Sequence, residues 1–542
     1  MRVKFFLENW HSIALLLILL MGLVCRLYRL VPPEVGLLYA QDADEGVYAT
    51  TAQLALQGYL PYRDFFTPMP PLAIYLFMVV LRIFYHPWGS PTGLMALRYA
   101  SVAYGLFTVL LTFFAANLIG GKRSGLLAAA IVAVDGIVVA QDRRAMLESL
   151  TNLFSLLAIL CYLLALRAPN VKDGLRKKPN SLILLAGFFC ALALLSKGTA
   201  IVPPLVIALA IFMQRRWREV WWFVVSFLGS YLLCAGLFLI TCPTDYIKQM
   251  YLFHLLRPWD GTAHPLARLA EIWNYPWSWI TVRISLVGVA ITFLAGKKVR
   301  HRRLWLLVLA WAVLVLLLLL SSRTYWATYF SQLAVPLAIL GGLLFNQEME
   351  HDMASPLDRL PVASQQLWSM LQVAVFVALL GLGFPRLLLQ FGSTKAALEQ
   401  IKPAYVEIST HIRRHLPDSV PILAFETNYT FLSSHPPAGA REGSFFIDSY
   451  GEMLYRNLGI PDKPIPVLLE VWVRSTRVRA QEVFHQQPAQ REVLAIFTRA
   501  PYIILDGRAL KQLSPDTTAY IRSHSQVLKS AYAAELRMRL AE

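Results

Sequence analysis

Charged residues are scarce in this sequence. Only 15% of its 542 residues are Asp, Glu, Lys or Arg, whereas 57% are hydrophobic. A soluble protein carries about 25% charged residues, so the composition excludes an ordinary soluble protein and indicates an integral membrane protein. The net charge of +17 does not indicate nucleic-acid binding, because the Lys and Arg residues lie mostly in short loops between apolar runs, where they orient membrane proteins.

Cysteine is also scarce, and its pattern excludes two kinds of stabilised fold. The five cysteines are Cys25, Cys161, Cys190, Cys234 and Cys242. Four lie in or beside apolar runs and none has metal-ligand spacing, which excludes a disulfide framework and a zinc site. Residues 11–30 follow Arg2 and Lys4 but lack a small-residue cleavage site, so we expect an uncleaved first membrane helix.

Long apolar runs make up most of residues 1–390. A helix needs about 20 apolar residues to cross the hydrocarbon core, and about eleven runs approach that length. They are 11–30, 96–119, 124–140, 149–167, 181–196, 199–213, 219–241, 277–296, 304–321, 326–345 and 367–390. The sequence therefore predicts a polytopic α-helical membrane domain. The run 71–85 is shorter, follows prolines and contains Arg82, so we expect an interfacial helix there.

The basic loops predict the orientation of this domain. If 71–85 does not cross, four basic loops share the side of the amino terminus. They lie near residues 122–123, 167–178, 215–218 and 297–303. The positive-inside rule then places the amino terminus inside and the carboxyl terminus outside. The outward loops carry charged or aromatic residues, which predicts a site opening outward; they are 31–70, 141–149, 196–200, 242–276 and 321–329.

The composition changes after residue 390. Apolar runs shorten to strand length at 421–425, 493–497 and 502–505, and they alternate with polar helical patterns at 404–416 and 517–530. Short strands that alternate with amphipathic helices are typical of an α/β domain. We expect residues 391–542 to form a soluble α/β domain on the outer side of the membrane.

The outer loop 31–70 carries the first candidate residues. Asp44 and Glu45 precede a helical pattern, where the helix dipole favours negative charge. One carboxylate can act as a general base while a cation or the scaffold holds the other, and partial desolvation at the interface raises the pKa toward the useful range. The alternative is a solvated loop with no chemical role.

Cationic groups follow at the outer ends of later spans. Arg143 and Arg144 precede Glu148, and Lys197 ends an apolar run. An arginine fork fits phosphate oxygens, so these residues are candidates for phosphate binding. The alternative is that they only anchor helix ends at the interface. Arg323 with its neighbouring aromatic residues is either a wall of the same site or part of an aromatic belt.

Five short motifs in this order resemble the GT-C superfamily of glycosyltransferases, in the bacterial branch related to protein O-mannosyltransferases and to the lipid A aminoarabinose transferase. The motifs are Asp44-Glu45, YRDFFTPMPPL (62–72), RRAMLE (143–148), LSKG (195–198) and a late span with Tyr329, Gln332 and Pro336. The likeness covers roughly residues 10–345. The tail is similar only as an α/β region after the last span.

The resemblance implies an enzyme that transfers a sugar from a polyprenyl-phosphate carrier. It implies Asp44 as general base, with Glu45 the second choice. The implied substrate- and phosphate-binding residues are Tyr62, Arg63, Asp64, Arg143, Arg144, Glu148, Lys197, Arg323 and Tyr329. Many relatives carry a basic residue where Met69 stands here. This departure implies either a different donor headgroup or a different cation at the phosphate, and in the second case the cation is Arg63 or Lys197.

These residues predict transfer to an acceptor hydroxyl with inversion, because one base without a second nucleophile favours a single displacement. No cofactor is required, and a divalent metal is possible but not indicated. We expect a bacterial inner membrane protein with its site facing the periplasm, a lipid, glycan or protein acceptor, and no nucleic-acid partner. A transporter or flippase of lipid-linked sugars is the alternative, but it requires charges in mid-span; a receptor or assembly protein is a third.

Overall fold

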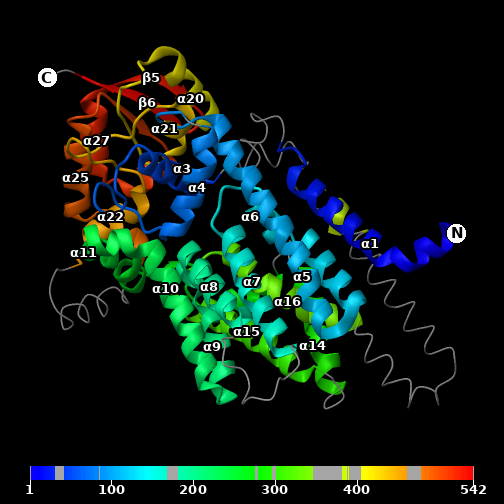
Figure 1. Ribbon diagram of the computed structural model, residues 1–542. Coiled ribbons are helices and arrows are strands. Elements are labelled where there is room, and N and C mark those ends of the chain that lie inside the picture. The colour runs from blue at the N-terminus through cyan, green and yellow to red at the C-terminus, as the bar shows by residue number, and fades with distance from the viewer. Residues whose placement is uncertain are drawn as a thin grey trace.

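The computed structural model describes most of the chain (Figure 1). The described residues are 2–30, 42–84, 86–167, 181–274, 279–295, 301–345, 381, 383–386, 388–389, 404–460 and 478–540. Some predicted features lie wholly or mostly outside these residues: loop residues 31–41, the basic segments 168–180 and 296–300, the span 367–390 and the domain boundary at 390–391.

Apolar helices form the larger part of the molecule. Within the described chain, six helices are long and apolar enough to cross a membrane, and four shorter apolar helices accompany them. The six are Trp10–Leu27, Pro91–Val134, Glu148–Arg167, Trp217–Thr241, Arg302–Ser321 and Ala327–Phe345. The protein is therefore a mostly helical, multi-pass membrane protein. The expected count of about eleven crossings and the orientation stay predictions.

The helices of this part follow closely on one another along the chain. They are α1 (Arg2–Leu27), α3 (Ala43–Leu56), α4 (Pro71–Ile83), α5 (Pro91–Val134), α6 (Gly136–Asp142), α7 (Glu148–Arg167), α8 (Ser181–Ser196), η1 (Gly198–Ile201), α9 (Val202–Met213), α10 (Trp217–Thr241), α11 (Pro243–Ile247), η2 (Lys248–Leu252), α12 (Phe253–Leu256), α13 (Pro265–Asn274), α14 (Trp279–Ala295), α15 (Arg302–Ser321), η4 (Ala327–Phe330), α16 (Ser331–Gly342) and η5 (Leu343–Phe345). Helices α4, α5 and α9 each have a proline in the first turn. The N–H that proline lacks has no hydrogen-bond partner within the helix at that position, so its loss costs nothing.

The segment labelled α5 contains a chain reversal. Gly121 has a φ of 85°, a backbone conformation that glycine adopts without strain. A Cβ placed at Gly125 would lie 2.7 Å from the carbonyl oxygen of Phe113, so the two halves of α5 pack closely beside each other. This reversal separates the predicted spans 96–119 and 124–140.

The second half of α5 ends earlier than the predicted span 124–140. It stops at Val134 because Asp135 caps a new helix, α6. The Asp135 carboxylate accepts hydrogen bonds from the backbone N–H groups of Ile137 and Val138, both at 3.0 Å. An aspartate cap of this kind satisfies donors that a helix start leaves free, and it turns the chain toward the candidate site.

Residues 404–540 contain a four-stranded sheet with helices packed around it. The strands are β3 (Ile422–Ala424), β4 (Tyr502–Leu505), β5 (Ser525–Ala531) and β6 (Ala534–Arg539), in the order β3-β4-β6-β5. β3 and β4 are parallel, whereas β4 and β5 both run antiparallel to β6. The helices are α20 (Ala404–His415), α21 (Asn428–Ser433), α22 (Ser449–Leu458), α24 (Ala480–Val483), α25 (Gln487–Phe497), α26 (Gly507–Gln512) and α27 (Pro515–Ser523).

The structure corrects two expectations in this region. The run 493–497, expected as a strand, is the end of helix α25. Its buried residues Val493, Ile496 and Phe497 have the i, i+3, i+4 spacing of a helix face, which a run this short does not reveal by itself. The segment 517–530, expected as a helix, divides into the end of α27 and most of β5.

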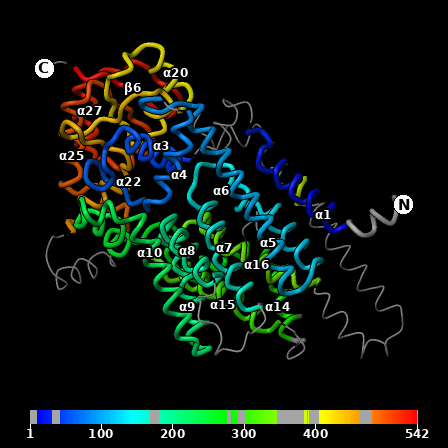
Figure 2. Tube along the Cα trace, viewed as in Figure 1, coloured from blue at the N-terminus to red at the C-terminus, as the bar shows by residue number. Residues whose placement is uncertain are grey.

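The carboxyl-terminal part packs directly against α3 (Figure 2). The side-chain amide of Asn428, at the start of α21, donates to the carbonyl of Asp42 over 2.7 Å. A Cβ at Gly46 would lie 2.4 Å from the backbone nitrogen of Asn428. The first turn of α3 is therefore held between the helical bundle and the α/β part, and this turn carries the first candidate residues.

Candidate functional site

Asp44 lies in the first turn of α3 and is half-buried. Its backbone N–H donates to the side chain of the capping residue Asp42 over 3.1 Å. Within the described residues, its own carboxylate has no hydrogen bond or ion pair. Burial and the neighbouring Asp42 charge raise the pKa of Asp44 to about 7, against the lowering effect of Arg508. Asp44 therefore combines an available carboxylate with a pKa near neutrality.

Glu45, the next residue, is fully engaged. Its carboxylate forms a buried, two-bond ion pair with Arg98 of α5 at 2.8 and 2.7 Å. It also accepts the backbone N–H groups of Ala145 at 2.7 Å and of Asp42 at 2.9 Å. All these contacts are structural, since they tie α3 to α5 and to the turn before α7. Of the two predicted carboxylates, the structure thus leaves Asp44 available and holds Glu45 in the scaffold.

The turn between α6 and α7 brings the second motif to the same place. Arg144 pairs with Asp42 at 2.9 Å. Arg143 is buried and donates to the carbonyl oxygens of Cys25 and Arg26, both at 3.0 Å. A cation suits the carboxyl end of a helix, where carbonyls lack partners. The structure therefore places both arginines near the acidic motif. Arg143 is bound to the end of α1, and Arg144 is bound to Asp42, the residue that caps α3.

Glu148 and Lys197 form a pair at the start of α7 and the end of α8. The Lys197 ammonium lies 2.5 Å from Oε1 of Glu148 and 4.4 Å from the centre of the Tyr329 ring. Burial by itself lowers the pKa of Lys197, but the charges of Glu148 and Asp44 outweigh it and raise the pKa above its usual value. Oε2 of Glu148 is buried without a hydrogen-bond partner in the described chain. The structure therefore brings Asp44, Glu148, Lys197 and Tyr329 together in one cluster of interacting groups.

The carboxyl-terminal part adds charged groups to this cluster. Arg508, at the start of α26, lies 3.5 Å from Glu426. Burial lowers the pKa of Arg508, but Glu426, Asp44 and Asp448 together raise it. Asp448 caps α22 by accepting from the N–H of Gly451 over 2.9 Å. Asp44 therefore faces the α/β part as well as the helical bundle.

Tyr62, Arg63 and Asp64 form a structured turn. The Tyr62 hydroxyl donates to the Met69 carbonyl, and its ring packs edge-on against Phe238, with centroids 4.8 Å apart. Arg63 and Asp64 pair with each other at 2.8 Å. These contacts occupy the polar groups of all three predicted residues and fix the loop that leads into α4.

Arg323 lies between α15 and η4, at the edge of a two-stranded pairing. There β1 (Asp260–Gly261) runs parallel to β2 (Thr324–Tyr325). Arg323 donates from its guanidinium to the carbonyl of Arg257 over 3.3 Å, and Arg257 pairs with Asp260 at 2.9 Å. The side chain of Arg323 is thus bound to the outer loop and joins the helical bundle to it.

Three functional candidates were missed in the sequence. Arg98 is the partner of Glu45, and its place at the start of the predicted span 96–119 was a usable signal, because a charge inside a span is rarely without a role. Asp448 and Arg508 lie in a region without a recognisable motif, so only the tertiary contacts identify them.

The arrangement offers two chemical functions. A carboxylate with a pKa of about 7 can accept a proton at neutral pH. A fixed ammonium such as that of Lys197 can stabilise negative charge that develops on a phosphate. Within the described residues, no three His, Cys, Asp or Glu side chains gather as a metal site.

Comparisons with known proteins show which families and folds the chain is similar to. Residues 71–256 match the family described as dolichyl-phosphate-mannose-protein mannosyltransferase. No curated protein sequence matches the chain. Among solved structures, ArnT from Cupriavidus metallidurans bound to undecaprenyl phosphate superposes with a TM-score of 0.60 and 16% identity, over 98% of each chain.

Archaeal structures are also similar. The Archaeoglobus fulgidus oligosaccharyltransferase in the apo form has a TM-score of 0.60 and 12% identity, over 92% of this chain and 70% of that one. AglB from the same organism, in complex with an inhibitory peptide and a dolichol-phosphate, has a TM-score of 0.58 and 12% identity over the same shares. The matches agree with the resemblance of the sequence motifs: the chain has the fold of the ArnT and oligosaccharyltransferase structures, and its residues 71–256 are similar to the mannosyltransferase family.

Proposed function

We propose that this protein is an integral membrane glycosyltransferase that moves a sugar from a polyprenyl-phosphate-linked donor to an acceptor hydroxyl. The observation that carries this proposal is the Asp44 carboxylate, which is half-buried, free of hydrogen-bond partners within the described residues and has a pKa of about 7. A general base needs to be partly ionised at the working pH and to be accessible to its proton donor. Asp44 meets both requirements.

In the proposed reaction, Asp44 takes the proton of the acceptor hydroxyl as that oxygen attacks the anomeric carbon. The bond from that carbon to the carrier phosphate breaks, and the polyprenyl monophosphate leaves with the bonding electrons. Lys197 stabilises the negative charge of this phosphate. The free Oε2 of Glu148 accepts a hydrogen bond from a hydroxyl of the donor sugar.

The solved relatives support a lipid phosphate as the carrier. ArnT was solved bound to undecaprenyl phosphate, and AglB with a dolichol-phosphate. We assign this group to the Lys197 ammonium, because it lies beside Glu148 and Tyr329 and interacts with Asp44, whereas Arg143 donates to carbonyl oxygens at the end of α1. We propose no required metal, because side-chain cations can neutralise a monophosphate.

We also propose inversion at the anomeric carbon. A single displacement requires one base and no enzyme nucleophile. The carboxylates that act on Asp44 are engaged by other groups: Asp42 pairs with Arg144, Asp448 caps α22 and Glu148 pairs with Lys197. The proposed location is the plasma membrane of a bacterium, with the site on the periplasmic side and the α/β part above it. The acceptor is a lipid, glycan or protein hydroxyl.

The direct test is Asp44→Asn, assayed for sugar transfer from the lipid-linked sugar that accumulates in cells lacking the gene. Mass spectrometry of that lipid fraction identifies the donor. We expect transfer to fall by about 10²-fold or more, the usual contribution of a general base, with the protein still folded in the membrane.

Asp516→Asn is the matched control, because Asp516 is an exposed aspartate in the first turn of another helix, α27, and is not among the groups that shift the pKa of Asp44. It should keep nearly full transfer. Normal turnover in Asp44→Asn would remove the base from the mechanism. Failure of the accumulating lipid-linked sugar to serve as donor in the unaltered protein would overturn the proposed reaction itself.

A further inference from the structure

A second polar cavity lies far from the Asp44 site, among the ends of α7, α9, α10 and α15. Its volume is about 520 Å³. The residues that line it are Ala165, Leu166, Arg167, Gln214, Arg216, His301, Arg302, Arg303, Leu304 and Leu306. The proposed transfer reaction uses none of them.

The cavity lies across the membrane from the candidate site. Glu148 begins α7 at the candidate site, and Arg167 ends the same helix at the cavity after 20 residues. At 1.5 Å per residue the two ends are about 30 Å apart, which is the thickness of the hydrocarbon core. Helix α15 also runs between the two sites. It begins at Arg302, which lines the cavity, and it leads into η4, which carries Tyr329 of the candidate site.

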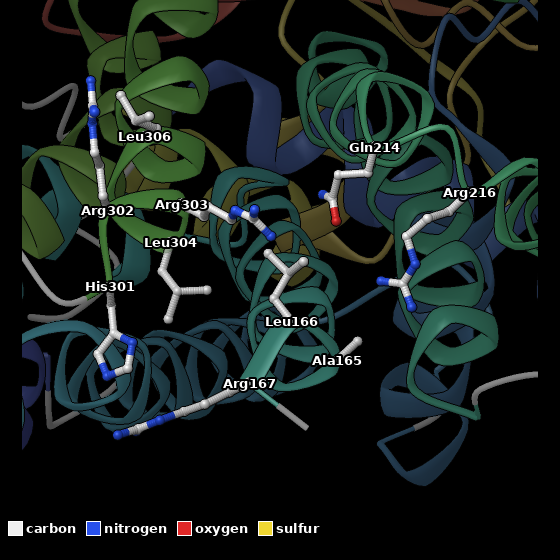
Figure 3. Close-up of a pocket in the computed structure, with 10 residues that line it drawn as sticks. All are labelled: Ala165, Leu166, Arg167, Gln214, Arg216, His301, Arg302, Arg303, Leu304 and Leu306. Atoms are coloured by element: carbon white, nitrogen blue, oxygen red, sulfur yellow. The ribbon is translucent and has the colours of Figure 1, made fainter. Parts of the chain in front are cut away.

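The charge of the cavity is of one sign. Of the described residues, four arginines line it and no carboxylate does. Arg167 and Arg303 have no ion pair or hydrogen bond within the described chain, whereas Arg216 pairs with Glu219 at the rim. Figure 3 shows the side chains of Arg303 and Arg216 extending toward each other, with Gln214 between them, while Arg302 points away. Guanidinium groups gathered in this way fit the oxygens of a phosphate.

The other lining residues indicate how the phosphate reaches the cavity. Leu166, Leu304 and Leu306 line it beside the arginines, and Leu306 is 42% exposed on the membrane-facing surface of α15. A free phosphate gains nothing from such neighbours, whereas the acyl chains of a lipid do. Snorkelling arginines at a span end explain positive charge at this level, but they do not explain a cavity between helices with arginines extending into it.

We propose that this cavity binds the phosphate headgroup of an anionic phospholipid from the leaflet opposite the transfer site. Arg303 and Arg216 hold the phosphate, and Leu306 contacts the first part of an acyl chain. Basic pockets between membrane helices are known to bind such headgroups. The bound lipid joins α15 to α9 and α10, so it stabilises the helical bundle.

The test is native mass spectrometry and thermal unfolding of the full-length protein in detergent, titrated with phosphatidylglycerol. The variants are Arg303→Gln and Arg216→Gln. The matched control is Arg215→Gln, because Arg215 is an exposed arginine of the same loop that does not line the cavity. Phosphatidylcholine and inorganic phosphate serve as the other probes, and circular dichroism checks that each variant is folded.

We expect phosphatidylglycerol to bind and to raise the unfolding temperature of the unaltered protein and of Arg215→Gln. Binding to each cavity variant should be about tenfold weaker, as the loss of one charged hydrogen bond predicts. Equal loss in Arg215→Gln would show general surface attraction and overturn the site, as would unchanged binding in the cavity variants. Equal stabilisation by inorganic phosphate or by phosphatidylcholine would overturn the assignment to an anionic lipid.

Discussion

Two neighbouring carboxylates, Asp44 and Glu45, have opposite environments although both stand in the first turn of α3. Successive residues of a helix point about 100° apart, so one side chain can face the bundle while the next faces the site. Glu45 is fully buried against Arg98, whereas Asp44 is half-buried and has no partner within the described residues. At the residue scale, this difference decides which carboxylate is available for proton transfer.

The raised pKa of Asp44 predicts the pH dependence of transfer. A base acts in its ionised form, so kcat/KM should rise with pH up to about 7, the pKa of Asp44, and level off above it. Arg508 lowers this pKa. Its replacement in Arg508→Gln should therefore move the rising limb to higher pH, as measured by transfer assays across a pH series.

Arg499→Gln supplies the control, because Arg499 is an exposed arginine of the same α/β part and is not among the groups that shift the pKa of Asp44. Its profile should coincide with that of the unaltered protein. A rising limb that stays in place in Arg508→Gln would show that Asp44 and Arg508 do not interact across the site.

At the scale of elements, α3 is held by a small number of buried polar contacts. Glu45 joins it to α5 through Arg98 and to the turn before α7 through the N–H of Ala145. Asn428 joins it to α21. A helix fixed at its first turn by three different elements keeps Asp44 in one position, as a reacting base requires.

This arrangement predicts a structural role for Glu45. Glu45→Gln leaves the Arg98 guanidinium buried without a counter-charge, which destabilises a protein by about 3–5 kcal/mol. We expect a markedly lower unfolding temperature, with transfer retained below that temperature because Asp44 is intact. Thermal unfolding in detergent, with transfer assayed in parallel, measures both.

The stability loss in Glu45→Gln is compared with the loss on removing one partner of the Arg63–Asp64 pair, in which the arginine side chain is 55% exposed. Removing one partner of such a pair changes stability by about 1 kcal/mol or less. Adding Arg98→Met to Glu45→Gln should recover part of the lost stability. An unchanged unfolding temperature together with lost transfer would instead make Glu45 a reacting group.

At the scale of the whole molecule, the two ends of the bundle differ in charge. The candidate site and the α/β part lie at one end, whereas Arg167, Arg216 and Arg303 line a cavity at the other. From the positive-inside rule we expect the basic end to face the cytoplasm and the α/β part to lie outside.

Labelling with a membrane-impermeant maleimide tests this orientation. Lys511→Cys and Lys122→Cys place thiols at exposed positions of the α/β part and of the α5 reversal, respectively. We expect Lys511→Cys to react in intact spheroplasts, and Lys122→Cys to react only after permeabilisation. Four of the native cysteines are buried and Cys234 is half-buried, so the background without either substitution should be low. The reverse pattern would invert the topology.

The sequence alone determined the class of the protein and predicted part of its candidate site. Apolar runs indicate membrane helices because backbone groups in lipid must form hydrogen bonds within their own helix. Most of the predicted spans are therefore helices in the structure, with bounds that differ by a few residues. The motifs around Asp44, Arg143 and Lys197 were recognised because each is short and continuous. Strand and helix were confused at 493–497, where the apolar run was too short for its period to be read.

Only the tertiary structure decided what each of these residues does. From the residues alone, Asp44 and Glu45 were adjacent carboxylates of the same kind, and only the family resemblance ranked Asp44 first. Arg98 and Arg508, which give the two carboxylates different environments, are distant along the chain. Ion pairs and desolvation depend on distances of a few ångströms between such residues. Residues that are far apart in the sequence reach these distances only when the chain folds, so a local sequence pattern does not reveal them. For the same reason, the basic cavity at the opposite end became visible only when α7, α9, α10 and α15 were brought together.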